Sequence, residues 1–160
     1  MTHADSDPDA DRPQERSLLL LVVGSTLLAE AIDRPAAYAL REHINAWFAD
    51  QGAELEPEER LVPVVCADLW FLNQPDLLHK PAIAIGAPST NAAVAYFAGR
   101  LPTVLAIDGG LQVCMDPELL EPRACVWGAR PESTPTAIEA FEARYLDPFL
   151  RAVHDLPALD

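Results

Sequence analysis

The chain has little positive charge. Its 160 residues contain 11 lysines and arginines against 25 aspartates and glutamates, which gives a formal net charge of −14 at pH 7. A chain of this kind repels the phosphates of nucleic acids and the surface of anionic membranes, because both are negatively charged. We therefore expect neither nucleic acid nor a membrane among its partners.

Long apolar runs are also missing. The first run, residues 18–23, is only about six residues long and follows an acidic segment. A secretory signal begins with basic residues, and a membrane-spanning helix needs roughly 20 apolar residues. The sequence thus indicates neither a secretory signal nor a transmembrane segment.

Cysteines are few and widely spaced. Cys66, Cys114 and Cys125 form an odd number without CxxC spacing, so a disulfide scaffold is not indicated and a reducing cytoplasm is the expected location. All three fall on expected strands, where a cysteine usually packs as a small hydrophobe. A redox or metal role is the alternative, although the four histidines lack the paired spacing of a zinc site.

No complete catalytic or nucleotide-binding signature is present. The sequence has no GxGxxG fingerprint, and its most suggestive loop lacks the lysine of a P-loop. The pattern therefore assigns no cofactor and leaves open whether the chain is an enzyme.

The composition favours one folded domain with a short tail. Half of the residues are hydrophobic, which is enough for a sizeable core in a chain of this length. Residues 1–16 carry five acidic side chains and almost nothing apolar, so we expect a disordered acidic tail. Residues 17–160 are expected to form a single α/β domain.

Alternating apolar runs and amphipathic segments predict the elements of this domain. We expect strands at residues 17–23, 61–66, 82–85, 103–107, 111–115 and 123–127, and helices at about 35–51, 90–99 and from 133 onward. Pro63 suits an edge strand, Asp33 or Arg34 is expected to cap the first helix, and Pro148 is expected to kink the last one.

The run from Ser17 to Val23 is apolar from Leu18 onward, as in a parallel strand buried on both faces. The segment after Asp108 predicts a hairpin with a turn that contains glycine. This architecture resembles Rossmann-like and flavodoxin-like α/β domains. We therefore expect a three-layer sandwich with a parallel core sheet, an antiparallel hairpin appendix and the common strand order 2-1-3-4.

The stretch at residues 83–91 passes from a buried strand through a tight loop into a helix start. In open parallel sheets, ligands bind beyond the carboxyl ends of the strands, where the strand order reverses. We expect this loop to face the turn after the first strand there. The candidate ligand-binding residues are Gly24, Ser25, Gly86, Ser89, Thr90 and Asn91. The alternative is that the hydroxyl and amide side chains only cap the helix.

Asp108 is the candidate catalytic residue. It follows the fourth expected strand, where a carboxylate could accept a sugar hydroxyl, bind a metal or act as a base. The alternative is an ordinary Asp-Gly turn. Asp68, after the second strand, has a similar pair of interpretations: a functional carboxylate, or a turn former or cap of a short helix. Trp70, Phe71 and Trp127 could line a pocket, form a subunit interface or pack in the core.

Two hypotheses follow. In the first, the chain is a cytoplasmic α/β domain that binds a nucleotide-like or phosphorylated small molecule at the carboxyl ends of its strands. In the second, it is a non-catalytic subunit that forms a homo-oligomer or binds another protein.

Overall fold

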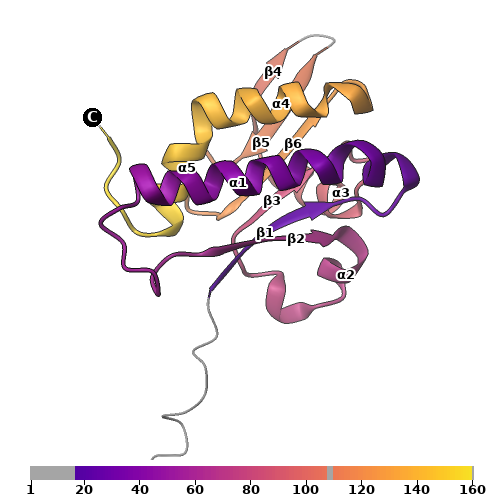
Figure 1. Cartoon of the computed structure of the whole chain (residues 1–160). Coiled ribbons are helices and arrows are strands. Elements are labelled where there is room, and N and C mark those ends of the chain that lie inside the picture. Colours follow the sequence, from indigo (N-terminus) through magenta and orange to yellow (C-terminus); the bar gives the residue numbers. More distant parts are fainter. Residues whose placement is uncertain (1–16, 108–109, 160) are drawn as a thin grey trace, which may run out of the picture.

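The structure, a computed structural model, describes residues 17–107 and 110–159; the predicted acidic tail lies outside the described residues (Figure 1). Six strands form one sheet in the order β2-β1-β3-β6-β5-β4. Their bounds are β1 (Leu18–Val23), β2 (Val62–Ala67), β3 (Ala82–Ile85), β4 (Thr103–Ile107), β5 (Leu111–Met115) and β6 (Arg123–Gly128). The predicted strands are thus present in the described chain.

The sheet is mostly parallel. Strands β2, β1, β3 and β6 pair in parallel, whereas β5 pairs antiparallel with both β6 and β4. The β4–β5 hairpin and the edge position of β2, with Pro63, agree with the sequence analysis. The expected order 2-1-3-4 is wrong after β3, because β6 takes the place beside it.

Burial explains why β6 rather than β4 lies beside β3. Ala124, Cys125 and Val126 in β6 are completely buried, so this strand needs neighbours on both edges and cover on both faces. Strand β4 is apolar in sequence, yet Thr103 and Ile107 are exposed at the edge of the sheet. An apolar sequence does not by itself mean that a strand is buried.

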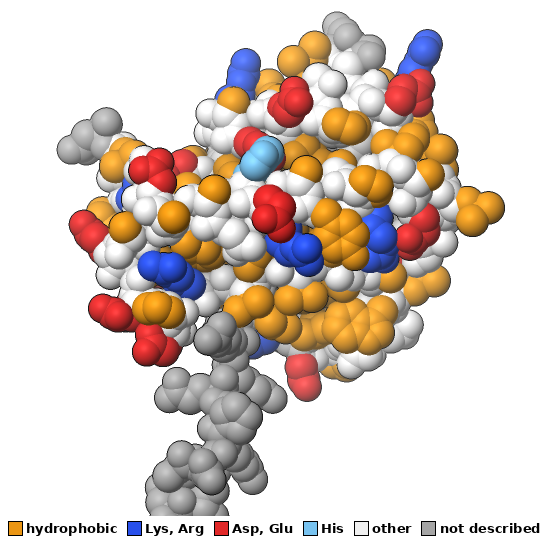
Figure 2. Space-filling view, in the orientation of Figure 1, with side chains coloured by type: hydrophobic (Ala, Val, Ile, Leu, Met, Phe, Trp, Pro, Cys, Tyr) orange, Lys and Arg blue, Asp and Glu red, His pale blue; other side chains and the backbone are white. Residues whose placement is uncertain are grey.

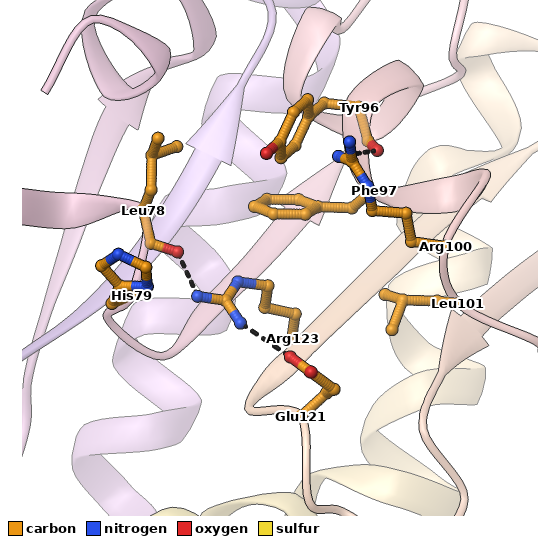
Figure 3. Close-up of a pocket in the computed structure, with 8 residues that line it drawn as sticks. All are labelled: Leu78, His79, Tyr96, Phe97, Arg100, Leu101, Glu121 and Arg123. Carbon is orange, nitrogen blue, oxygen red and sulfur yellow. Dashed lines mark hydrogen bonds and ion pairs between the residues drawn. The ribbon is translucent and has the colours of Figure 1, made fainter. Parts of the chain in front are cut away.

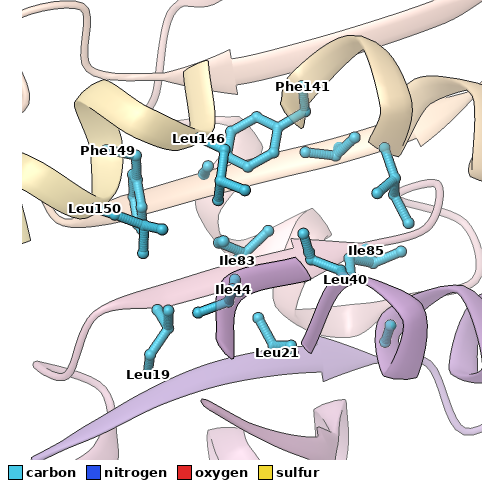
Figure 4. Packing of buried hydrophobic residues seen from close by; sticks show 14 of the residues in the cluster. Leu19, Leu21, Leu40, Ile44, Ile83, Ile85, Phe141, Leu146, Phe149 and Leu150 are labelled. Atoms are coloured by element: carbon cyan, nitrogen blue, oxygen red, sulfur yellow. The ribbon is translucent and has the colours of Figure 1, made fainter. Parts of the chain in front are cut away.

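Helices cover both faces of the sheet. One face packs against α1 (Arg34–Asp50), α4 (Thr134–Phe141) and α5 (Asp147–Val153), and the other against α2 (Asp68–Leu72) and α3 (Ala92–Ala98) (Figure 1). Leu19 and Leu21 of β1 point into the first layer, where they meet Leu40, Ile44 and residues of α5 (Figure 4). Leu20 points into the second layer.

Two wide π-helical turns interrupt the regular helices. The first, η1 (Ala29–Asp33), runs directly into α1, so Asp33 is already helical, with φ −73° and ψ −39°. The expectation that Asp33 or Arg34 caps α1 is therefore wrong. The second, η4 (Glu142–Leu146), separates α4 from α5 just before Pro148, which agrees with the expected break in the terminal helix. Short 3₁₀ turns, η2 (Pro75–Leu77) and η3 (Pro131–Ser133), complete the connections.

Within the described ranges, no helix has both the length and the apolar character that a membrane span requires.

Candidate functional site

The carboxyl ends of β1 and β3 form the point where the strand order reverses. From β1 the chain moves to β2 on one side and later to β3 on the other. The loops after these two strands touch: a Cβ atom added at Gly24 would lie 2.1 Å from the carbonyl oxygen of Thr90. Glycine at position 24 allows this close approach. The predicted meeting of the two loops is thus observed.

Asn91 holds this junction together. Its Nδ2 donates to the carbonyl oxygens of Val22 (3.0 Å) and Ile85 (2.9 Å), near the ends of β1 and β3. Its Oδ1 accepts hydrogen bonds from the backbone N–H groups of Ala93 (2.9 Å) and Val94 (3.2 Å), which caps α3. Asn91 is 1% exposed. Both ends of its amide are used within the fold, and a ligand contact by Asn91 stays a prediction.

Ser25, a candidate ligand-binding residue, bonds to Asp68 within the fold. Its hydroxyl donates to Oδ1 of Asp68 (2.5 Å), and Oδ2 of Asp68 accepts from the backbone N–H of Ala92 (2.7 Å). Asp68 is buried and joins the loop after β1 to the starts of α2 and α3. The first N–H groups of α3 are therefore already bonded to Asp68 and Asn91.

A second buried carboxylate lies at the same edge, on the α1 side of the sheet. Gly86 has a φ of +119°, and a Cβ atom there would lie 2.7 Å from Oδ2 of Asp33. The glycine thus provides both the backbone conformation and the space that Asp33 occupies. Asp33 is 4% exposed, and its Oδ1 has no hydrogen-bond partner among the described residues.

The environment of Asp33 favours its protonated form. Burial raises the pKa of this carboxyl group from 3.8 to about 6, and the neighbouring Thr134 hydroxyl opposes only part of the shift. A buried carboxyl group without a cationic partner is costly to ionise, because it loses its hydration. Ionisable groups perturbed in this way are concentrated at functional sites.

Asp33 lines a pocket of about 100 Å³ built from three loops. Asp33 comes from the segment after β1, Ser89 and Thr90 from the loop after β3, and Arg130 and Thr134 from the segment after β6. The pocket combines a buried acceptor, hydroxyl groups and a guanidinium group. It can therefore accept a hydrogen bond from a ligand and also contact an anionic group.

Only some of the predicted ligand-binding residues lie together at the Asp33 pocket. Ser89 and Thr90 line the pocket and Gly86 adjoins Asp33, whereas Ser25 is bonded to Asp68 and is not part of the lining. The predicted catalytic residue, Asp108, lies outside the described residues, and its role stays a prediction.

Asp33 was missed because Pro35 made it look like a helix cap. The signal that could have found it was its position directly after the mostly apolar run of residues 27–32.

The cysteines behave as core residues. Cys66, Cys114 and Cys125 are free and buried, and all pack in the α2–α3 layer. Burial raises the pKa of the Cys66 thiol to about 11 and that of Cys125 to about 12, so both stay protonated at neutral pH. The described part of the chain also contains no cluster of three or more His, Cys, Asp or Glu side chains that could hold a metal ion.

Comparison of the chain with protein-family models, curated proteins and solved structures finds no match in any of the three. The protein is a mixed α/β domain with a six-stranded, mostly parallel sheet. At the carboxyl ends of its parallel strands it carries a small polar pocket around a buried carboxylate.

Proposed function

We propose that the chain binds a small molecule that has a hydroxyl or amino group, and that this group donates a hydrogen bond to Asp33. The observation that carries the proposal is the buried carboxylate, whose Oδ1 has no partner among the described residues. A buried acceptor without a donor costs roughly 1–3 kcal/mol, which a ligand donor would recover. If the bound molecule reacts, Asp33 is the group suited to proton transfer, since its pKa is about 6.

Arg130, in the lining of the same pocket, supports an anionic group on the same ligand. Arg130 is exposed, lines the pocket with Ser89, and has no carboxylate within 4.0 Å among the described residues. A guanidinium group recognises phosphate oxygens in a fixed fork geometry. A hydroxylated phosphate ester, such as a nucleotide or a sugar phosphate, would donate a hydroxyl hydrogen bond to Asp33 and place its phosphate on Arg130. The pocket volume of about 100 Å³ accommodates only part of such a molecule, so the rest would extend into solvent.

The place of the pocket supports the same proposal. We propose that the domain is related in architecture to Rossmann-like or flavodoxin-like folds, which bind ligands where the strand order reverses. The order 2-1-3 and the helices on both faces are consistent with either. Similarity of architecture supports a location for the ligand but does not identify it.

A thermal-shift screen followed by titration calorimetry tests the proposal. The panel contains nucleosides, nucleoside monophosphates, sugar phosphates and inorganic phosphate, at pH 7.5. A ligand at about 100 times its Kd adds about 2.7 kcal/mol of stability, which raises the Tm by several degrees. We expect at least one hydroxylated phosphate ester to do so, and Asp33→Asn to weaken its binding about tenfold or more.

Glu132→Gln is the matched control, because Glu132 is an exposed acid close in sequence to the pocket lining but not part of it. Its affinity is expected to equal that of the native chain. A panel without any binder, or an affinity that Asp33→Asn leaves unchanged, would contradict the proposal.

Exposed apolar side chains support self-association as a second candidate function. Leu27 is 91% exposed, and Leu69 and Trp70 are 56% and 49% exposed. The hydrogen bond between Ser25 and Asp68 links the loop that precedes Leu27 to α2, so these side chains share one edge of the molecule. Figure 2 shows hydrophobic side chains gathered over the region of α2 and β2. Apolar groups on adjoining elements are typical of protein interfaces.

Light scattering distinguishes this candidate from a monomeric binding domain. We expect the native chain to have the mass of a dimer or larger assembly, and the double variant Leu27→Ser/Trp70→Ser to have the mass of a monomer. Leu120→Ser is the control, because Leu120 is 79% exposed in the loop that enters the amino end of β6, whereas Leu27 and α2 follow the carboxyl ends of β1 and β2. A native chain that is monomeric at all concentrations would exclude self-association.

A further inference from the structure

A pocket larger than the Asp33 pocket lies at the other end of the parallel strands, near the amino ends of β3 and β6. Its volume is about 270 Å³, and its walls come from the end of α3 and from the segments that precede the two strands (Figure 3). It shares no lining residue with the Asp33 pocket. Any ligand here would therefore bind independently of the function proposed above.

Apolar side chains form much of the wall. Leu78, Phe97 and Leu101 line the pocket, and Tyr96 stands beside Phe97 with a ring-centroid separation of 5.2 Å. Phe97 is buried, whereas Tyr96 is 44% exposed. Surfaces of this kind favour the apolar part of a ligand, because its transfer from water is favourable.

Arg123 is a fixed positive charge at the base of the pocket. One of its terminal nitrogens donates to the carbonyl oxygen of Leu78, and the other donates to Oε2 of Glu121 at 3.0 Å (Figure 3). Its side chain is only 12% exposed, and its guanidinium carbon lies 5.4 Å from the centre of the Phe97 ring. Arg123 is thus held by the fold through its two terminal nitrogens, while its Nε is buried and has no hydrogen-bond partner among the described residues.

Arg100 is the available cation. Its guanidinium group stacks on the Tyr96 ring at 3.9 Å and donates one hydrogen bond, to the carbonyl oxygen of Tyr96 (3.2 Å). Among the residues that the structure describes, no carboxylate lies within 4.0 Å of it. A guanidinium group has five N–H donors, so most of those of Arg100 remain available while stacking orients the group.

The charges of the lining favour an anion. Two guanidinium groups, those of Arg100 and Arg123, line the pocket with a single carboxylate, that of Glu121. This local positive excess occurs in a chain whose net charge is −14. The net negative charge of the chain repels a dianion more strongly than a monoanion. A carboxylate, which is planar and carries one charge, is therefore the anion that best fits the Arg100 fork.

We propose that this pocket binds a small aromatic or branched-chain carboxylic acid, with the carboxylate on Arg100 and the apolar body against Phe97, Leu78 and Leu101. The volume limits the size of the ligand, since pockets for drug-sized ligands measure about 300–1,000 Å³ and this one, at about 270 Å³, is slightly smaller.

The test uses the full chain and four probes: benzoate, phenyl phosphate, benzyl alcohol and inorganic phosphate. Binding is followed by calorimetry and by the shifts of backbone amide resonances in a two-dimensional NMR spectrum. We expect benzoate to bind most tightly of the four and to shift the amides of residues 78–79, 96–101 and 121–123. Arg100→Gln is expected to weaken benzoate binding about tenfold or more, because a charge-assisted hydrogen bond is lost.

Arg144→Gln is the matched control, since Arg144 is an exposed arginine in η4, on the other face of the sheet, and should leave the affinity unchanged. Any of four results would overturn the proposal: no benzoate binding, equal binding of benzyl alcohol, displacement by inorganic phosphate at the same concentration, or an Arg100→Gln variant with native affinity. Phenyl phosphate binding more tightly than benzoate would overturn the choice of a carboxylate.

Discussion

Replacement of Asn91 by alanine is expected to lower the free energy of unfolding by about 3 kcal/mol or more. The change removes the donor to two carbonyl oxygens near the strand ends, those of Val22 and Ile85, and the acceptor for two N–H groups of α3. Loss of a helix cap alone costs about 1 kcal/mol, and each buried polar group left unpaired costs roughly 1–3 kcal/mol. The side chain is buried, so water cannot readily replace it.

Two further substitutions of Asn91 separate its role as the cap of α3 from its link to the strands. Asn91→Ser keeps a capping oxygen but loses the link to the strands, so its loss of stability should be smaller than that of alanine. Asn91→Asp keeps the cap but places an oxygen opposite the two carbonyl groups, so its loss should equal or exceed that of alanine. Asn45→Ala, at an exposed site on α1, is the control and should change stability little. Urea unfolding measures all four, and a near-neutral Asn91→Ala variant would contradict the assigned role.

Asp33→Asn is expected to have the opposite effect and to stabilise the chain at pH 7.5, by about 1–3 kcal/mol. The pKa of Asp33 is raised from 3.8 to about 6, and each pKa unit corresponds to about 1.36 kcal/mol. The folded state therefore binds more protons than the unfolded state between these two values. Asp33 contributes most favourably below about pH 4, and its contribution is lost as the pH rises through about 6.

Unfolding experiments across pH 4 to 8 check this prediction. The stability difference between Asp33→Asn and the native chain should be small at pH 4, grow up to about pH 6, and then remain constant. His154 acts in the other direction, since burial lowers its pKa from 6.5 and its contribution is lost as the pH falls. Because both chains contain His154, its effect cancels in the difference. A gain independent of pH, or no gain at pH 7.5, would contradict the assignment.

Together with the binding test, this result separates a functional group from a structural one. A residue that only supports the fold destabilises the chain when it is replaced. Asp33 is expected to stabilise the chain when replaced by asparagine and to lose ligand binding at the same time. Such an exchange of stability for function is common where a site keeps a strained or unpaired group.

The positions of the strands could be predicted from the sequence because they depend on local pattern. The continuous apolar run of residues 18–23 became β1, and the alternating segment after Gly110 became β5. Pro63 correctly indicated an edge strand. The limit of local pattern is clear in β4, whose apolar sequence suggested burial although the strand lies at the sheet edge.

The location of the candidate site could be predicted from the sequence, but the hydrogen bonds that its residues form could not. The contact between the loops after β1 and β3 was expected, and Gly24, Gly86, Ser89 and Thr90 lie there. The sequence could not show that Asn91 and Asp68 already bond the first N–H groups of α3. Those bonds depend on side chains that only the folded chain brings together.

By itself, then, the sequence determined the α/β class, the strand and helix segments and the edge of the sheet at which the loops meet, because apolar periodicity and turn residues act over a few positions. The tertiary structure alone decided that β6 lies beside β3 and that Asp33 is buried behind Gly86, with no cationic side chain within 4.0 Å of its carboxylate among the described residues. It also decided that Arg100 and Arg123 share one pocket. The physical reason is the same in each case: burial and ionisation depend on neighbours far away in the sequence, which no local pattern specifies.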